Sequence, residues 1–178
     1  MIKTICGLFI GICMSSLSGM AQAVPANWNC NTNEEFNVKI CHPATWNFDD
    51  TTSGAKFFVF SPAENAQDQF SQNFNLQASN LGGESINLQQ YVKLNIVDIK
   101  ANIKNYQQVS IKNITVKGVR WSELVYTGNL ENDPLKIKFI QRFAIDKGNA
   151  FVLTYSAEAN KLDKLYPTAL KIFNSIEL

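Results

Sequence analysis

The chain has 178 residues, of which 46% are hydrophobic and 17% charged, and its 16 basic side chains nearly balance 15 acidic ones. An apolar content this high, with 12 Phe, excludes an intrinsically disordered chain. The near-neutral charge gives no general attraction to nucleic acid or to an anionic membrane, so we predict no nucleic-acid partner.

Residues 1–23 have the pattern of a secretory signal peptide. Lys3 precedes an apolar run over residues 5–14, and the segment ends in the cleavage motif Ala-Gln-Ala at 21–23. The run is shorter than the about 20 residues that a membrane-spanning helix needs. We therefore predict an exported protein, periplasmic or secreted, whose mature chain 24–178 has no transmembrane segment.

Two of the four cysteines, Cys6 and Cys13, lie in the signal segment, which leaves Cys30 and Cys41 in the mature chain. An even pair in an oxidising compartment predicts a disulfide between them. Their separation differs from the Cys-x-x-Cys spacing of redox sites, which disfavours a redox role. Lipid attachment at Cys13 is disfavoured because the bulky Ile12 precedes it.

The first half of the mature chain carries three strand patterns. Apolar and polar residues alternate over 36–40, and His42-Pro43 ends this strand because proline lacks the donor that a β-ladder needs. The aromatic and β-branched run within 56–60 predicts a strand buried on both faces. Alternation returns over 74–78 and predicts a half-buried strand.

After Gly82-Gly83 the apolar period changes from two to 3.6 residues, which predicts an amphipathic helix. Its apolar stripe consists of Leu88, Tyr91, Val92, Ile96, Ile99 and Ile103. Asn87 and Gln90 are spaced as a capping pair at its start.

Strand patterns return after Tyr106, over residues 109–111, 116–126, 135–145 and 150–156. Asp-Lys-Gly-Asn at 146–149 predicts a hairpin in which Gly148 takes the positive φ of a three-residue loop, so the last two strands pair antiparallel. Apolar residues at spacings of three and four over 162–176 predict a second amphipathic helix, kinked or restarted at Pro167.

The strand over 116–126 has apolar residues on both faces. Val119, Trp121 and Val125 share one face, and Leu124 and Tyr126 share the other. Both faces then need cover, which the two helices can supply. The sequence therefore predicts one α+β domain, an α-β-α sandwich whose central, mainly antiparallel sheet is covered by helices on both faces.

Six short motifs occur in an order that resembles the PsbP/DcrB/Mog-like superfamily, which includes PsbP of photosystem II and the bacterial envelope protein DcrB. They are Pro43-Ala44-Thr45-Trp46, residues 57–62, Ser85-Ile86-Asn87-Leu88, residues 121–128 with Pro134-Leu135, residues 150–157 and Phe173-Asn174-Ser175-Ile176. The resemblance implies an α-β-α sandwich and a binding or accessory role. The metal-associated residues of the photosystem member have no matching motif here.

Catalytic and metal-binding patterns point to no site residue. His42 is the single histidine, and no Gly-x-Ser-x-Gly motif presents a nucleophile beside it. Asp49-Asp50 and the acidic turn at 131–133 lack the repeated spacing of a calcium loop. We therefore predict no catalytic, cofactor-binding or metal-ligating residue, and interpret these groups as turn or surface residues.

Aromatic residues are concentrated in the N-terminal third. Most should belong to the core, but Trp28, Trp46 and Phe48 are candidates for a partner or ligand surface. Lys136, Lys138 and Arg142 alternate along one predicted strand and make either a basic face or a solvated sheet edge.

Three hypotheses of function follow. The first is a non-enzymatic binding or accessory protein of the bacterial cell envelope, exported, with an unknown envelope protein as partner. The alternative is a carrier of a small apolar molecule, with its pocket between the aromatic N-terminal third and one helix. A hydrolase with an unrecognised site is the third, and it has no candidate residues.

Overall fold

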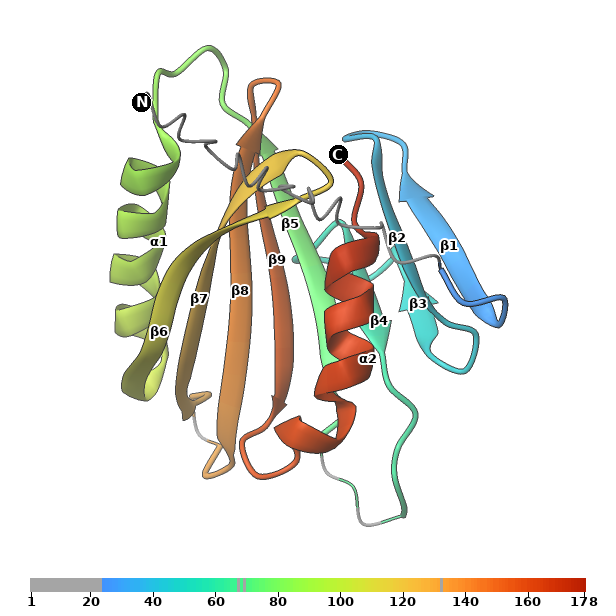
Figure 1. Cartoon of the computed structure of the whole chain (residues 1–178). Coiled ribbons are helices and arrows are strands. Elements are labelled where there is room, and N and C mark those ends of the chain that lie inside the picture. The colour runs from blue at the N-terminus through green and yellow to red at the C-terminus, as the bar shows by residue number, and fades with distance from the viewer. Residues whose placement is uncertain (1–23, 67, 69, 132) are drawn as a thin grey trace, which may run out of the picture.

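The computed structural model describes residues 24–178 except 67, 69 and 132, so the predicted signal peptide lies outside the described residues. Figure 1 shows a large twisted sheet, with helices packed on it and a small hairpin beside it. The elements are β1 (Trp28–Asn33), β2 (Val38–Pro43), β3 (Asn47–Asp49), β4 (Phe57–Phe60), β5 (Asn73–Asn80), α1 (Leu88–Asn102), β6 (Lys104–Val116), β7 (Val119–Asn129), β8 (Lys136–Asp146), β9 (Asn149–Glu158) and α2 (Leu162–Ser175).

The large sheet has seven strands in the order β3-β4-β5-β9-β8-β7-β6, and every neighbouring pair is antiparallel. β5 pairs with β9 from Asn73 opposite Ser156 to Asn80 opposite Asn149, which joins the first three strands to the last four. β1 and β2 form a separate two-stranded sheet. The predicted α+β class with a mainly antiparallel sheet is confirmed.

Two hairpins close through the same dipeptide, Lys117-Gly118 between β6 and β7 and Lys147-Gly148 between β8 and β9. All four residues have positive φ, at 47° and 84° in the first turn and 46° and 78° in the second. Positive φ at both central residues is the pattern of a two-residue type I′ turn, whose twist matches that of the strands. The predicted three-residue loop is therefore wrong, and the predicted strand 116–126 is interrupted at its start.

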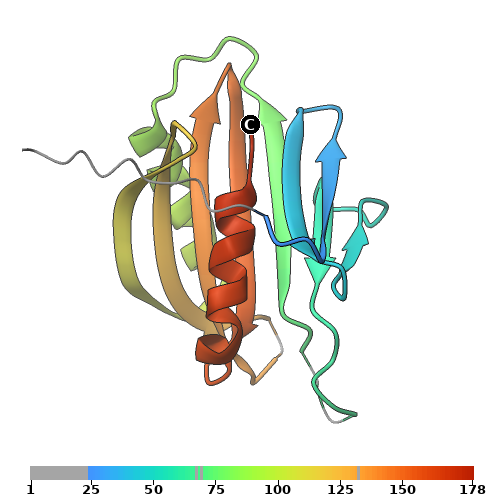
Figure 2. The same cartoon turned by 45° about the vertical axis from the view of Figure 1, so that its right-hand side comes forward.

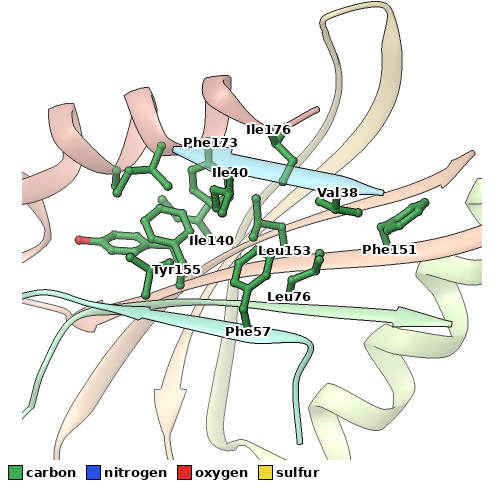
Figure 3. Packing of buried hydrophobic residues seen from close by; sticks show 14 of the residues in the cluster. Val38, Ile40, Phe57, Leu76, Ile140, Phe151, Leu153, Tyr155, Phe173 and Ile176 are labelled. Carbon is green, nitrogen blue, oxygen red and sulfur yellow. The ribbon is translucent and has the colours of Figure 1, made fainter. Parts of the chain in front are cut away.

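Alternate side chains of the central strands belong to two different hydrophobic clusters. On β8, Ile140 and Ala144 lie in the larger cluster, whereas Phe139 and Phe143 lie in the smaller one. Figure 3 shows the larger cluster, in which Phe173 of α2 points toward the side chains of the sheet and β2. The division follows from the period of two in a strand.

α1 contributes to the smaller cluster through its apolar stripe, with Val92 buried against β7, β8 and β9. No β4 residue belongs to that cluster, and Phe58 and Phe60 are only half-buried. Phe57 and Val59, on the opposite face, are fully buried. The prediction that this strand is buried on both faces is therefore wrong, because α1 packs over the other half of the sheet.

The β1–β2 hairpin packs beside α2 (Figure 2). The Cys41 backbone N–H donates to Ser175 Oγ at 2.9 Å, and Glu177 forms a bridge with Lys39 of β2. α2 continues through Pro167 without a break in its assigned span. Among the described residues, neither helix combines the length and the apolar character that a membrane crossing demands.

Candidate functional site

A cleft of about 620 Å³ lies between α1 and the β6–β7 hairpin. It is lined by Asn87, Leu88, Gln89, Val92, Lys93 and Ile96 from the α1 side, and by Ile111, Lys112, Asn113, Arg120 and Ser122 from the hairpin. Its volume is in the range of small-molecule sites.

The first turn of α1, which forms one end of the cleft, is fixed by a capping box. The Gln90 backbone N–H donates to Asn87 Oδ1 at 3.0 Å, and the Asn87 backbone N–H donates to Gln90 Oε1 at 3.0 Å. The reciprocal bonds satisfy two donors that a helix start leaves free. The capping pair predicted from the sequence is confirmed.

The other end of α1 lies tightly against β7. The helix ends with the Ile103 backbone N–H donating to Ile99 O at 2.8 Å. A Cβ on Gly128 would lie 2.2 Å from Ile103 Cγ2 and 2.8 Å from Lys104 O, so only glycine permits this approach. The end of α1 and the start of β6 therefore lie close together. From there the two elements diverge toward the Lys117-Gly118 turn (Figure 1). The cleft occupies the wide end.

Four of the eleven residues that line the cleft are aliphatic. Leu88, Val92 and Ile96 lie on consecutive turns of α1, and Val92 is 4% exposed because the sheet covers it. Ile111 on β6 is 45% exposed, although its side chain borders the cleft. An aliphatic side chain left open to water beside a concave surface offers contact area to an apolar ligand.

Three cationic residues line the cleft, but they are not equivalent. Lys112 Nζ lies 3.1 Å from Glu123 Oε1 and is already paired. The exposed side chains of Lys93 and Arg120 make no ion pair or hydrogen bond within the described part of the chain. Two unpaired cations beside aliphatic walls attract an anion.

Ser122 is the buried polar residue of the cleft, at 5% exposure. It alternates with Trp121 and Glu123 on β7 and shares the face of Leu124, which packs in the α1 cluster. Its hydroxyl makes no hydrogen bond to any residue that the structure describes. A hydroxyl without a protein partner at the wall of a cleft is available to a ligand or to water.

A second polar group is buried on the opposite face of the sheet. Arg142 Nε donates to Glu123 Oε2 at 2.8 Å, with both side chains at most 5% exposed, and the Arg142 guanidinium lies 4.2 Å from the Phe173 ring centroid. Burial lowers the pKa of Arg142, and the charge of Glu123 opposes this. This pair is enclosed by α2, so neither the predicted basic face nor the solvated edge describes Arg142 correctly.

The aromatic residues predicted as a partner or ligand surface lie elsewhere. Trp46 is 7% exposed, and its ring centroid is 6.4 Å from that of Phe74. Phe48 is half-buried against Phe57, and Trp28 is half-buried against the same large cluster. None of the three lines the cleft, and their proposed role stays a prediction.

The disulfide Cys30–Cys41 is present and joins facing residues of β1 and β2. His42, next to it, is buried, with Nε2 at 2.9 Å from Asn31 Oδ1 and Nδ1 at 3.0 Å from Pro43 O. This environment holds the imidazole in the hairpin and away from the cleft.

Sequence reasoning missed the cleft, although one signal was present. Ile111 and Asn113 alternate on one strand, and Arg120 and Ser122 alternate on the next, so the hairpin pairing places all four on one face. Recognition of Lys117-Gly118 as a turn would have brought them together. The apolar stripe of α1 did not indicate that the first two turns of the helix lie beside a cleft.

No protein-family model and no curated protein matches the sequence. Several solved structures do. Cyanobacterial PsbP (CyanoP) from Synechocystis sp. PCC 6803 matches with a TM-score of 0.60 at 12% identity, over 93% of this chain and 98% of its own. LpqN of Mycobacterium tuberculosis, described as involved in cell envelope biogenesis, matches with a TM-score of 0.63 at 14% identity, over 84% and 88%.

A protein of unknown function from Pseudomonas aeruginosa, PA94, matches with a TM-score of 0.60 at 12% identity, over 85% of this chain and 97% of its own. Identities this low establish a common fold and nothing about shared partners. The chain therefore has the PsbP-like and DcrB-like fold that its sequence motifs predicted.

Proposed function

We propose that this chain is a non-enzymatic binding protein of the bacterial cell envelope, exported and built as an α-β-α sandwich. The observation that carries the proposal is the cleft between α1 and the β6–β7 hairpin, with aliphatic walls and two unpaired cations. Such groups bind and orient a ligand, whereas acid–base catalysis needs a group that exchanges protons near neutral pH.

Export is supported by the Cys30–Cys41 disulfide, because disulfides persist in oxidising compartments outside the cytoplasm. The signal pattern of residues 1–23 supports the same address. Fractionation of cells that express the full chain, followed by intact mass measurement, tests this part. We expect an envelope or secreted fraction and a mass that corresponds to cleavage after Ala23. An uncleaved chain in the cytoplasm would contradict it.

The binding role is tested by mild crosslinking in intact cells and capture from the envelope extract. We expect a specific protein or small molecule that is lost when Ile111→Asp places a charge in the cleft, and that is retained in Leu170→Asp on α2. Leu170 is the matched control because it is also an exposed aliphatic residue. Capture of nothing specific in replicate experiments would refute the proposal.

Between the two kinds of partner considered from the sequence, the cleft favours a small molecule. Its 620 Å³ volume is in the range of small-molecule sites, whereas a protein partner needs a broad surface. This supports the carrier hypothesis, with the site moved from the aromatic N-terminal third to the α1 side. Native mass spectrometry of the purified protein is the direct measurement.

A further inference from the structure

The shape of the cleft restricts its ligand. The α1 residues that line it extend from Leu88 to Ile96, which is two turns of helix or about 12 Å. β6 forms the opposite wall through Ile111. A trough between a helix and a strand matches a straight aliphatic chain, because such a chain contacts both walls along its length.

Exposed apolar side chains are frequent on the two elements that form the walls of the cleft. Of the seven large apolar side chains that are exposed in the described part of the chain, four lie on α1 or β6. They are Leu94, Val97, Val109 and Ile111. Of these four, Ile111 lines the cleft, where its exposed side chain can contact an apolar ligand.

The charges at the cleft restrict the polar head group that such an aliphatic chain can carry. Lys93 on α1 and Arg120 on β7 approach it from opposite walls, and neither is paired among the described residues. Glu123, the acidic residue next to Ser122, is on the opposite face and is bound to Arg142 and Lys112. A carboxylate would supply both cations with a partner, and a guanidinium can bind it through two parallel hydrogen bonds.

Ser122, a residue at 5% exposure, adds a hydroxyl without a protein partner in the same cleft. A hydroxyl can donate to a carboxylate oxygen. The combination of aliphatic side chains, two opposed cations and one hydroxyl donor disfavours a cationic amphiphile. A neutral amphiphile would leave the two cations without a charged partner.

We propose that the cleft between α1 and the β6–β7 hairpin binds a single-chain amphiphile with a carboxylate head, that is, a free fatty acid. The chain lies between Val92, Ile96 and Ile111, and the head lies between Lys93 and Arg120. This assignment rests on the proposed binding function and names its ligand class.

The test uses the full chain, expressed so that the host exports and processes it, and dodecanoate below its micelle-forming concentration. Isothermal titration calorimetry should show saturable binding of one dodecanoate per protein. Dodecyl maltoside and dodecyltrimethylammonium carry the same chain with a neutral and a cationic head. We expect both to bind roughly tenfold or more weakly, since charge-assisted hydrogen bonds exceed neutral ones in strength.

Variants separate the head from the chain. Lys93→Gln with Arg120→Gln should weaken dodecanoate binding by roughly tenfold to a hundredfold and leave dodecyl maltoside unchanged. Ile111→Ser should weaken both amphiphiles, and it should fold because the side chain is already half exposed. Lys104→Gln with Lys171→Gln is the control for lost charge, since both lysines are exposed and lie outside the cleft.

Backbone NMR shifts locate the ligand independently of affinity. Dodecanoate should move the amide signals of Ile96, Ile111 and Ser122 most. Equal binding by the Lys93/Arg120 variant, equal binding of the cationic amphiphile, or shifts centred outside the cleft would each overturn the assignment. Absence of dodecanoate binding would overturn it as well, and specific capture from the envelope in the crosslinking experiment would then leave the proposed binding function standing.

Discussion

The two helices use their faces of the sheet differently. α2 lies over a filled core, where Phe173 packs on Arg142 and the Glu123–Arg142 pair is enclosed. α1 contacts the sheet closely at Gly128 but borders a cleft along its first two turns. Both sides contain buried apolar residues, but the α1 side also borders the cleft. We therefore expect substitutions beside the cleft to cost less stability than substitutions in the core under α2.

Phe173→Ala should have the largest effect, because it leaves a cavity in the larger cluster and removes the ring beneath Arg142. We expect the free energy of unfolding to fall by about 3 to 5 kcal/mol. Leu94→Ala on the exposed side of α1 should change it by about 0.5 kcal/mol or less. Urea unfolding measures both, and equal losses would contradict the proposed division between the two sides.

Glu123→Ala should come next, since it leaves the buried Arg142 charge without its carboxylate. Removal of one member of a buried ion pair costs about 3 to 5 kcal/mol. The double variant Glu123→Leu with Arg142→Met should recover most of this loss, because no buried charge remains. If the single and double variants unfold at the same urea concentration, an unpaired charge is not the cause.

Gly128→Ala tests the tight end of α1. The new methyl would collide with Ile103 and with the Lys104 carbonyl oxygen, so we expect a loss of about 1 to 3 kcal/mol. Ile103→Ala should relieve only the side-chain collision, because the carbonyl is part of the backbone. If the effects of Gly128→Ala and Ile103→Ala on the free energy of unfolding are additive, the two side chains do not collide. This would show that α1 moves away from β7 without strain.

His42 should give the smallest effect, visible as pH dependence. Burial lowers the pKa of His42, and the hydrogen bond to Pro43 O opposes this. The unfolded chain therefore binds the proton more readily than the folded chain, so stability is complete above about pH 6.5 and falls as the pH decreases below it. The unfolding midpoint should differ less between about pH 7.5 and about pH 5.5 in His42→Gln than in the unsubstituted protein. An identical difference in both proteins would contradict this assignment.

The elements with strong periodicity were predictable from the sequence. The helix beginning at Leu88, its capping box and the alternating faces of β7 all depend on local spacing, and the structure has them. β1 was missed because Asn occupies half of its positions and is depleted in strands. Pairing with β2 and the disulfide stabilise it despite this composition.

The Lys117-Gly118 turn and the cleft were not predictable in the same way. Lysine rarely adopts positive φ, so Lys117 gave no turn signal, and only the pairing of Val116 with Val119 requires that conformation. The cleft depends on the angle at which β6 leaves α1, which tertiary contacts at Gly128 determine. Its residues appear in the sequence as ordinary core and surface positions.

The pairing of β5 with β9 has a consequence for synthesis of the chain. β5 ends at Asn80 and β9 begins at Asn149. The edge of β5 that pairs with β9 therefore stays unpaired until residues 149–158 have been synthesised. Open strand edges of this kind template aggregation. A ribosome therefore delivers the early strands long before β9, and chaperone protection during that interval would favour the correct product.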